Sequence, residues 1–167
     1  MERDDGRLDR HLPAGTHRLP TGATPLGAGT RGGSGQVSTA AVAERNAAIV
    51  ERFYESERRR DLETWASLWH PAGRQTFPFS KESEVRGIND LRRVTARKFE
   101  VRPPYEIHTR VEAFADPHRV LARLRLVMTV PAGAEVNIWC VFHFDDDGRV
   151  LEVEEMLDTA SAPPVPQ

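Results

Sequence analysis

The most informative hydrophobic pattern lies near the C-terminal end, where two runs of alternating apolar and polar residues flank the segment 145–148, Asp-Asp-Asp-Gly. Asp-Gly between such runs is the strongest short-range signal for a β-hairpin. A two-residue turn at Asp-Gly would give the cross-strand pairs Phe144–Leu151, Phe142–Val153, Cys140–Glu155 and Ile138–Leu157, and a four-residue loop would keep the same parity. The sequence therefore predicts a hairpin over about residues 135–158.

One face of this hairpin is apolar except for a single carboxylate. Because side chains alternate along a strand, Glu155 shares that face with residues such as Phe142 and Val153. Apolar surroundings would raise the pKa of Glu155 toward neutral pH, which suits a general acid or base. A three-residue turn would reverse the parity and place Glu154 on this face instead. Glu155 is thus the candidate catalytic residue, and Glu154 is the alternative.

Helical periodicity dominates the region before the strands. Apolar residues spaced by three and four predict a first helix from about Thr39 to Arg59. Asp61 suits the N-cap of a second, short helix, which Pro71 would end. The apolar stripes consist of Val42, Asn46, Ile49, Val50, Phe53 and Tyr54 in the first helix, and Leu62, Trp65, Leu68 and Trp69 in the second. The two helices are predicted to form an αα-hairpin that presents aromatic side chains to an apolar core.

A short strand and a third helix are predicted next. Alternation over residues 74–79 indicates a strand at the edge of a sheet, the position that an internal proline tolerates. A polar loop over residues 80–86 follows. A helical stripe then begins near Gly87 or Asn89 and consists of Ile88, Leu91, Val94, Thr95 and Phe99. The basic residues on the other side of this helix fit a solvated face better than an anion site; they are Arg92, Arg93, Arg97 and Lys98.

The periodicity then changes from helical to two. Residues 105–113 and 120–128 alternate on either side of a turn segment at 116–119, which predicts a long hairpin with a polar face that could pair Glu112 with Arg123 or Arg125. Helices come first and strands later, so the fold class is α+β, with an antiparallel sheet.

Composition divides the chain into three parts. Residues 1–37 contain eight of the twelve glycines and no aromatic residue. Such a segment cannot bury enough apolar surface to offset its loss of conformational entropy. We therefore predict a disordered N-terminal arm over 1–37, a folded domain over 38–159 and a disordered tail over 160–167.

Charge and composition exclude several kinds of partner and cofactor. The formal net charge of -2 disfavours nucleic acid and anionic membranes. No apolar run approaches the roughly 18 residues of a membrane span, so we expect a soluble, cytoplasmic protein. The single cysteine, Cys140, cannot form an internal disulfide and suits a buried structural position. Without metal-ligand spacing among the histidines or a glycine-rich phosphate loop, we expect neither metal nor nucleotide cofactor.

The outer face of the closing hairpin predicts a subunit interface. Trp139, Val141 and Met156 share this parity and would form an exposed apolar cluster, which commonly marks an interface. His143 lies on the same side and is expected to pair with Glu152. The sequence thus predicts a homodimer through the outer sheet face.

Four segments of the sequence resemble a known family: N-A-A-I-V-E-R-F-Y at 46–54, L-W-H-P-A-G-R-Q-T-F-P-F at 68–79, R-G-I-N-D-L at 86–91 and E-E-M-L-D at 154–158. Together with the order of elements, they resemble the nuclear transport factor 2-like superfamily, most closely its SnoaL-like group and the phenazine-biosynthesis A/B proteins. The resemblance spans about residues 39–158.

The resemblance implies a cone in which three helices pack over the concave face of a curved sheet and enclose a deep apolar pocket. Such proteins often dimerise through the outer sheet face, and their enzymes use neither metal nor nucleotide. Glu155 matches the glutamate that serves as acid/base in phenazine-type proteins. The pocket walls would be formed by Tyr54, Trp65, Trp69, Phe77, Phe79 and Cys140.

Two departures from the phenazine-type pattern point to a more apolar substrate. Val94 stands where those proteins carry a histidine, and Trp65 where they carry an arginine. Our hypothesis is a cofactor-independent cyclase, isomerase or dehydratase that acts on a small hydrophobic molecule of secondary metabolism. The alternative is a non-catalytic member of the same fold that binds a small molecule or acts as a scaffold.

Overall fold

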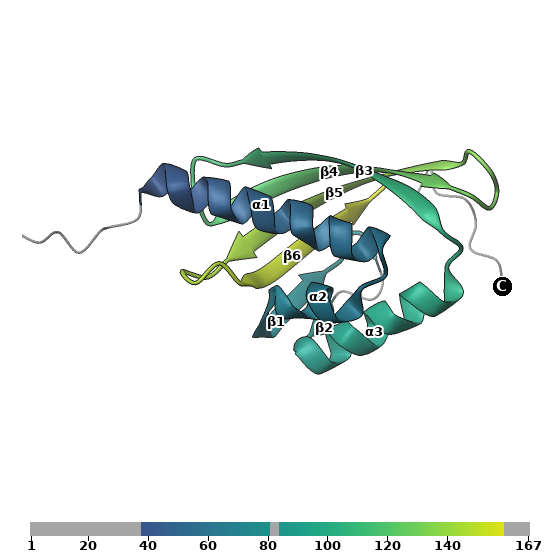
Figure 1. The fold of residues 1–167 in the computed structure, drawn as a ribbon, viewed down its shortest axis with the longest axis horizontal. Coiled ribbons are helices and arrows are strands. Elements are labelled where there is room, and N and C mark those ends of the chain that lie inside the picture. The colour runs from purple at the N-terminus through teal and green to yellow at the C-terminus, as the bar shows by residue number, and fades with distance from the viewer. Residues whose placement is uncertain (1–37, 81–83, 159–167) are drawn as a thin grey trace, which may run out of the picture. The chain divides into compact units, whose positions relative to one another are not determined.

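The computed structural model describes residues 38–80 and 84–158 (Figure 1). The predicted arm at 1–37 and the predicted tail at 160–167 lie outside the described residues. The elements follow in the order α1 (Thr39–Arg58), α2 (Leu62–Ser67), β1 (Trp69–Thr76), β2 (Glu84–Arg86), α3 (Ile88–Val101), β3 (Tyr105–Ala113), β4 (Arg119–Met128), β5 (Glu135–Phe144) and β6 (Val150–Leu157).

Side-chain caps fix where the first two helices begin. The Ser38 hydroxyl accepts a hydrogen bond from the backbone N–H of Ala41 at 3.2 Å and starts α1. The Asp61 carboxylate accepts from the backbone N–H of Thr64 at 3.0 Å and starts α2, as its sequence position predicted. Gly87, at φ 81°, precedes α3 and adopts a conformation that glycine tolerates best.

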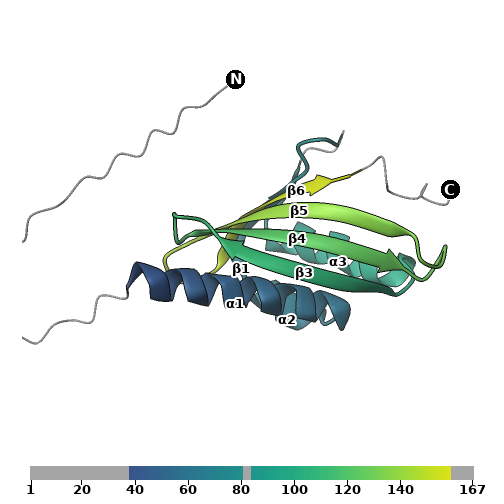
Figure 2. The ribbon, with the colours of Figure 1, turned by 90° about the horizontal axis from the view of Figure 1, so that it is seen from above.

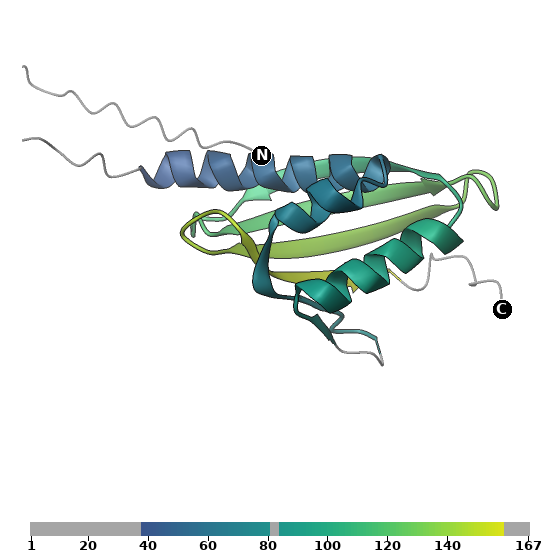
Figure 3. The same cartoon turned by 60° about the horizontal axis from the view of Figure 1, so that its bottom comes forward.

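The strands form one six-stranded sheet in the order β2-β1-β6-β5-β4-β3. Strands β3 to β6 pair antiparallel, as predicted, whereas β1 joins β6 in parallel, so the sheet is mixed. Figure 2 shows the curved sheet from its face, with β6, β5, β4 and β3 side by side and α3 behind them. All three helices lie on the same side of it (Figure 3). The α+β class with helices over one sheet face is confirmed.

The first strand differs from its prediction in both position and neighbours. Trp69 is not part of the second helix; it is the first residue of β1, which ends at Thr76. The backbone N–H of Val150 donates to the carbonyl of Leu68 at 2.9 Å, so the chain passes from α2 directly onto the sheet. The edge position belongs to β2, which arises from the predicted polar loop, and β1 lies between β2 and β6.

The closing hairpin has the predicted register over most of its length. The Cα partners Ile138–Leu157, Cys140–Glu155 and Phe142–Val153 are all present. A bulge between His143 and Phe144 changes the end of the hairpin, where Phe144 pairs with Val150. As a result Val150 is fully buried, and Leu151, predicted to face inward, is 37% exposed.

The core lies between the helices and the inner sheet face. Phe142 is fully buried and meets Phe53 and Tyr54 edge-on, with ring centroids 5.1 and 5.8 Å apart. Edge-to-face contacts of this kind stabilise a core beyond the apolar area that they bury. They also fix the face of α1 that looks onto the sheet.

The outer face of the sheet is more polar than predicted. Trp139 is 50% exposed, with the Arg123 guanidinium 5.5 Å from its ring centroid. Val141, expected to be exposed beside it, is only 9% exposed. The exposed apolar surface is therefore smaller than the predicted cluster. None of the helices in the described part of the chain has the length and apolar character needed to cross a bilayer.

Candidate functional site

A cavity of about 140 Å³ lies between the helices and the inner sheet face. All three helices and five of the six strands contribute to its wall. The apolar lining consists of Phe53, Trp65, Phe77, Val94, Ile107, Leu124, Leu126, Ile138 and Val153, and the polar lining of Tyr54, Glu57, Gln75, Thr95, Lys98, Arg102 and Glu155. The exposed lining residues, Val94 and Arg102, indicate where the cavity reaches solvent.

Glu155 extends from β6 into this cavity, on the parity that the sequence predicted. Its Oε2 accepts a hydrogen bond from the side-chain amide of Gln75 at 2.6 Å. Glu154 lies on the opposite parity, where its Oε1 is 2.7 Å from Nε2 of His143. The closing hairpin therefore places one of its two adjacent glutamates in the cavity and the other on the outer face.

The surroundings of Glu155 raise its pKa above the usual range. The main cause is loss of hydration among apolar neighbours, which disfavours the charged carboxylate. The positive charge of Lys98 acts in the opposite direction, as do Arg102 and the hydrogen bond from Gln75, while the negative charge of Glu57 adds to the increase. A raised pKa brings a carboxyl group closer to the pH range in which it can both give and accept a proton.

A second polar group joins three elements at the cavity wall. The carboxylate of Glu57 on α1 accepts from Nζ of Lys98 on α3 at 2.8 Å and from the hydroxyl of Tyr105 on β3 at 3.0 Å. The side chains of Glu57 and Lys98 are only 11% and 23% exposed, so this ion pair is largely shielded from water. It holds the charges that act on Glu155 in fixed positions.

Tyr54 and Cys140 are hydrogen-bonded to each other through their side chains. Burial raises the pKa of both groups well above their usual values, and the nearby charge of Glu155 adds to the increase for Cys140. Both groups therefore remain protonated at neutral pH. The thiol of Cys140 is not activated as a nucleophile, in agreement with the structural position expected for it.

The two positions at which the sequence departs from the phenazine-type pattern both line the cavity. Trp65 is 1% exposed, and its indole N–H has no hydrogen-bond partner among the described residues. Buried donors are normally paired, so an unpartnered indole N–H is unusual. Val94 adds apolar surface where a histidine would add a titratable group.

The residues predicted from sequence fall into three groups. Tyr54, Trp65, Phe77 and Glu155 line the cavity. Trp69 and Cys140 are buried in the core and do not line it. The third group is Phe79 alone, which follows β1 and is 75% exposed, so it is not part of the cavity wall.

Five polar lining residues were not predicted as part of the site: Glu57, Gln75, Thr95, Lys98 and Arg102. Gln75 and Glu155 are 80 positions apart in sequence and meet because β1 runs parallel to β6. Lys98 was assigned to the solvated side of its helix, where a basic residue is normally expected. The alternation around Gln75 was visible in the sequence, but no local signal indicated its partner strand.

No three histidine, cysteine or carboxylate side chains gather into a metal-binding group within residues 38–80 and 84–158.

The comparison with known proteins supports one fold. A model of the SnoaL-like domain matches residues 50–153. No curated protein sequence is significantly similar to the chain.

Among solved structures, a phenazine biosynthesis-related protein from Pseudomonas aeruginosa is 17% identical, with a TM-score of 0.60, and the match covers 77% of this chain and 92% of that one. A steroid delta-isomerase from Pseudomonas aeruginosa is 24% identical, with a TM-score of 0.56 and coverage of 70% and 82%. An epoxide hydrolase from M. tuberculosis is 21% identical, with a TM-score of 0.58 and coverage of 71% and 86%. At these identities the similarity establishes a shared nuclear transport factor 2-like fold.

Proposed function

The chain belongs to the SnoaL-like domain family, and from this premise we propose that it is a cofactor-independent enzyme that transfers a proton on a small hydrophobic molecule. The observation that carries the proposal is the buried carboxyl group of Glu155, which lines the cavity, has a raised pKa and accepts a hydrogen bond from Gln75. Cyclases, isomerases and dehydratases that work by proton transfer need a positioned acid or base, and a carboxyl group can serve.

The proton would move through Glu155 alone. As a carboxylate it removes a proton from a carbon atom of the substrate, and as a carboxylic acid it returns the proton to another position or to a leaving oxygen. Gln75 holds the carboxylate in place by donating to Oε2, and this leaves Oε1 for the substrate. The charge of Lys98 opposes the increase in the pKa of Glu155 and so favours its basic form.

Removal of a proton beside a carbonyl group places negative charge on the carbonyl oxygen. Trp65 lies in the cavity wall, and its buried indole N–H has no partner in the described part of the chain. A hydrogen-bond donor aimed at such an oxygen stabilises the transition state more than the ground state. Trp65 is thus our candidate for this role.

The size of the cavity limits the substrate. Its volume of about 140 Å³ is close to that of an apolar protein cavity of about 150 Å³ that accommodates benzene. The reacting part of the substrate should therefore be no larger than about one six-membered ring. A larger molecule would extend past Val94 and Arg102 into solvent.

Solvent exchange of a small cyclic ketone tests this proposal without knowledge of the natural substrate. In D₂O, the wild type should accelerate exchange of the protons beside the carbonyl of cyclohexenone, followed by NMR. Glu155→Gln should lower this rate by about 100-fold or more, the usual scale of general acid–base assistance. Glu154→Gln, on the other face of the same strand, is the matched control and should retain the wild-type rate.

Two results would contradict the proposal. Equal exchange rates in the wild type and Glu155→Gln would show that Glu155 takes no part in the reaction. Loss of rate in Glu154→Gln alone would show that Glu154, and not Glu155, transfers the proton. A wild type that binds cyclohexenone without accelerating exchange would favour the alternative, a non-catalytic binding member of the family.

A further inference from the structure

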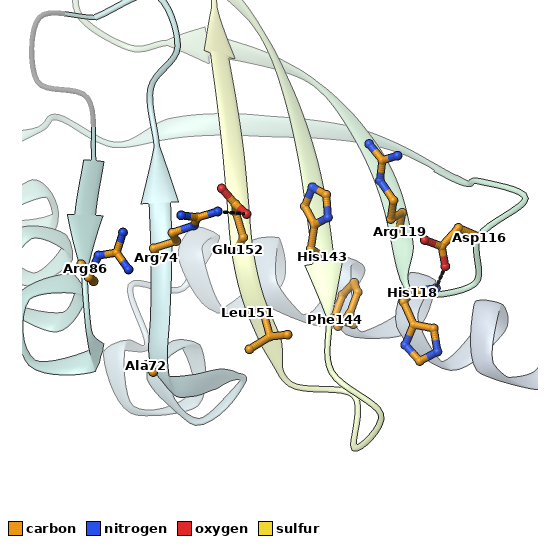
Figure 4. Close-up of a pocket in the computed structure, with 10 residues that line it drawn as sticks. All are labelled: Ala72, Arg74, Arg86, Asp116, His118, Arg119, His143, Phe144, Leu151 and Glu152. Carbon is orange, nitrogen blue, oxygen red and sulfur yellow. Dashed lines mark hydrogen bonds and ion pairs between the residues drawn. The ribbon is translucent and has the colours of Figure 1, made fainter.

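Five ionisable side chains form a single row across the outer face of the sheet, away from the cavity described above. Successive Cα partners across β2, β1, β6, β5 and β4 are Arg86, Arg74, Glu152, His143 and Arg119. Figure 4 shows these five side chains following one another across the strands. The five residues form a row because the registers of four strand pairings place them side by side on the same face of the sheet.

This row forms one wall of a groove of about 500 Å³. The rest of the lining is apolar at Ala72, Phe144 and Leu151, with Asp116 and His118 at the turn before β4 (Figure 4). The volume falls within the range of about 300 to 1,000 Å³ that is usual for small-molecule sites. The groove can therefore accept a larger molecule than the cavity beneath the helices.

The groove lining contains three guanidinium groups and two carboxylates, with two imidazoles beside them. His143 lies 2.7 Å from the carboxylate of Glu154. Arg74 is paired with Glu152 at 2.7 Å, and Arg86 with Glu84 at 3.0 Å. Arg86 and Arg74 are nevertheless direct cross-strand partners, an arrangement of like charges that costs stability.

Arg119 adds a donor that the protein does not use. Its Nε is buried and has no hydrogen-bond partner among the described residues, and its guanidinium lies 4.9 Å from the ring centroid of Phe114. Buried donors are normally paired with an acceptor. A ligand oxygen in the groove would supply one.

The residues two positions further along each strand form a second row on the same face, and this row contains no basic residue. Its Cα partners run Glu84, Thr76, Glu154, Val141, Leu121 and Glu112. Three carboxylates beside the basic row would repel an extended polyanion such as nucleic acid. They leave room for a single anionic group.

We propose that this groove is a second binding site, for a small organic molecule that carries an oxyanion, either a carboxylate or a phosphate, next to an apolar portion. Arginine forks match the geometry of both oxyanions and bind them through paired N–H donors. The apolar portion would cover Leu151, which is 37% exposed. The site is separate from the cavity of Glu155, since the two lie on opposite faces of the sheet.

Phenyl phosphate and benzoate test the site, with inorganic phosphate as the probe of the oxyanion alone. Each is titrated into the protein and followed by calorimetry and by backbone amide shifts. Phenyl phosphate should bind about 10-fold tighter than inorganic phosphate, because only it covers the apolar part of the groove. Arg119→Gln and Arg86→Gln, at opposite ends of the row, should each weaken its binding about 10-fold, the usual scale for a lost charged hydrogen bond.

Arg125→Gln is the matched control. Arg125 lies on the same strand and face as Arg119 and is paired with Glu135 at 2.7 Å, outside the groove. Its replacement should leave the affinity for phenyl phosphate unchanged. The proposal is overturned if no probe saturates by about 10 mM, or if Arg125→Gln weakens binding as much as the two groove variants do. Arg86 has a side chain 60% exposed at the sheet edge, so its variant gives a readout even if Arg119→Gln fails to fold.

Discussion

Replacement of Lys98 by methionine tests the polar group that surrounds Glu155. The change removes the cation that pairs with Glu57 at 2.8 Å and leaves this carboxylate, which is only 11% exposed, without its ion pair. Loss of one partner costs 3–5 kcal/mol in a fully buried pair and less than about 1 kcal/mol at the surface. Because Lys98 is 23% exposed and Tyr105 still donates to Glu57, we expect about 1–3 kcal/mol, measured by urea denaturation.

The neighbouring residue supplies the control. Arg97 is paired with Glu100 at 3.3 Å on the solvent side of the same helix, and both side chains are more than two-thirds exposed. Arg97→Met should therefore cost less than about 1 kcal/mol. The double variant Lys98→Met/Glu57→Gln should recover part of the stability lost in Lys98→Met, because the isolated charge has been removed. The reasoning is refuted if Lys98→Met costs no more than Arg97→Met.

The same variant should change the chemistry in a defined direction. Among the groups that lower the pKa of Glu155, Lys98 has the largest effect. Its removal, with Glu57 left in place, should raise this pKa further. The limb of the pH–rate profile that reports the basic form of Glu155 should then move to higher pH, and Arg97→Met should leave it in place.

Three further predictions concern stability and assembly. Gly73→Ala should destabilise the fold by about 1–3 kcal/mol in chemical denaturation, because a Cβ there would lie 2.7 Å from Cε3 of Trp69 and 3.1 Å from the carbonyl of Val150. The half-exposed Trp139 is proposed to lie in a homodimer interface, so Trp139→Glu should lower the sedimentation coefficient to that of a monomer. Since the folded state binds the proton of Glu155 more tightly than the unfolded chain, the wild type should lose stability relative to Glu155→Gln as pH rises from about 4.3 through the raised pKa.

The closing hairpin shows how much of the fold could be read from the sequence. Strict alternation and the Asp-Gly turn predicted four cross-strand pairs, and three of them are present in the structure. The prediction succeeds because a register shifted by one residue would expose the whole apolar face. The same rule placed Glu155 inside and Glu154 outside. The bulge near Phe144 was not predicted from the local pattern.

The first strand shows why other features could not be predicted. In the sequence, Trp69 continues the apolar stripe of the second helix. In the structure, Trp69 is part of the sheet, because it pairs with β6. Parallel pairing joins segments distant in sequence and leaves no local signature. For the same reason the contact between Gln75 and Glu155 became visible only in the structure.

The central claim is that the fold raises the pKa of Glu155 and thereby makes it a general acid or base. The most direct test is an NMR titration of protein labelled with ¹³C at the glutamate side-chain carboxyl carbons. The Glu155 signal is identified by its absence in Glu155→Gln. We predict that this signal titrates above the ordinary glutamate value of about 4.3. A Glu155 midpoint at or below the ordinary value would contradict the account.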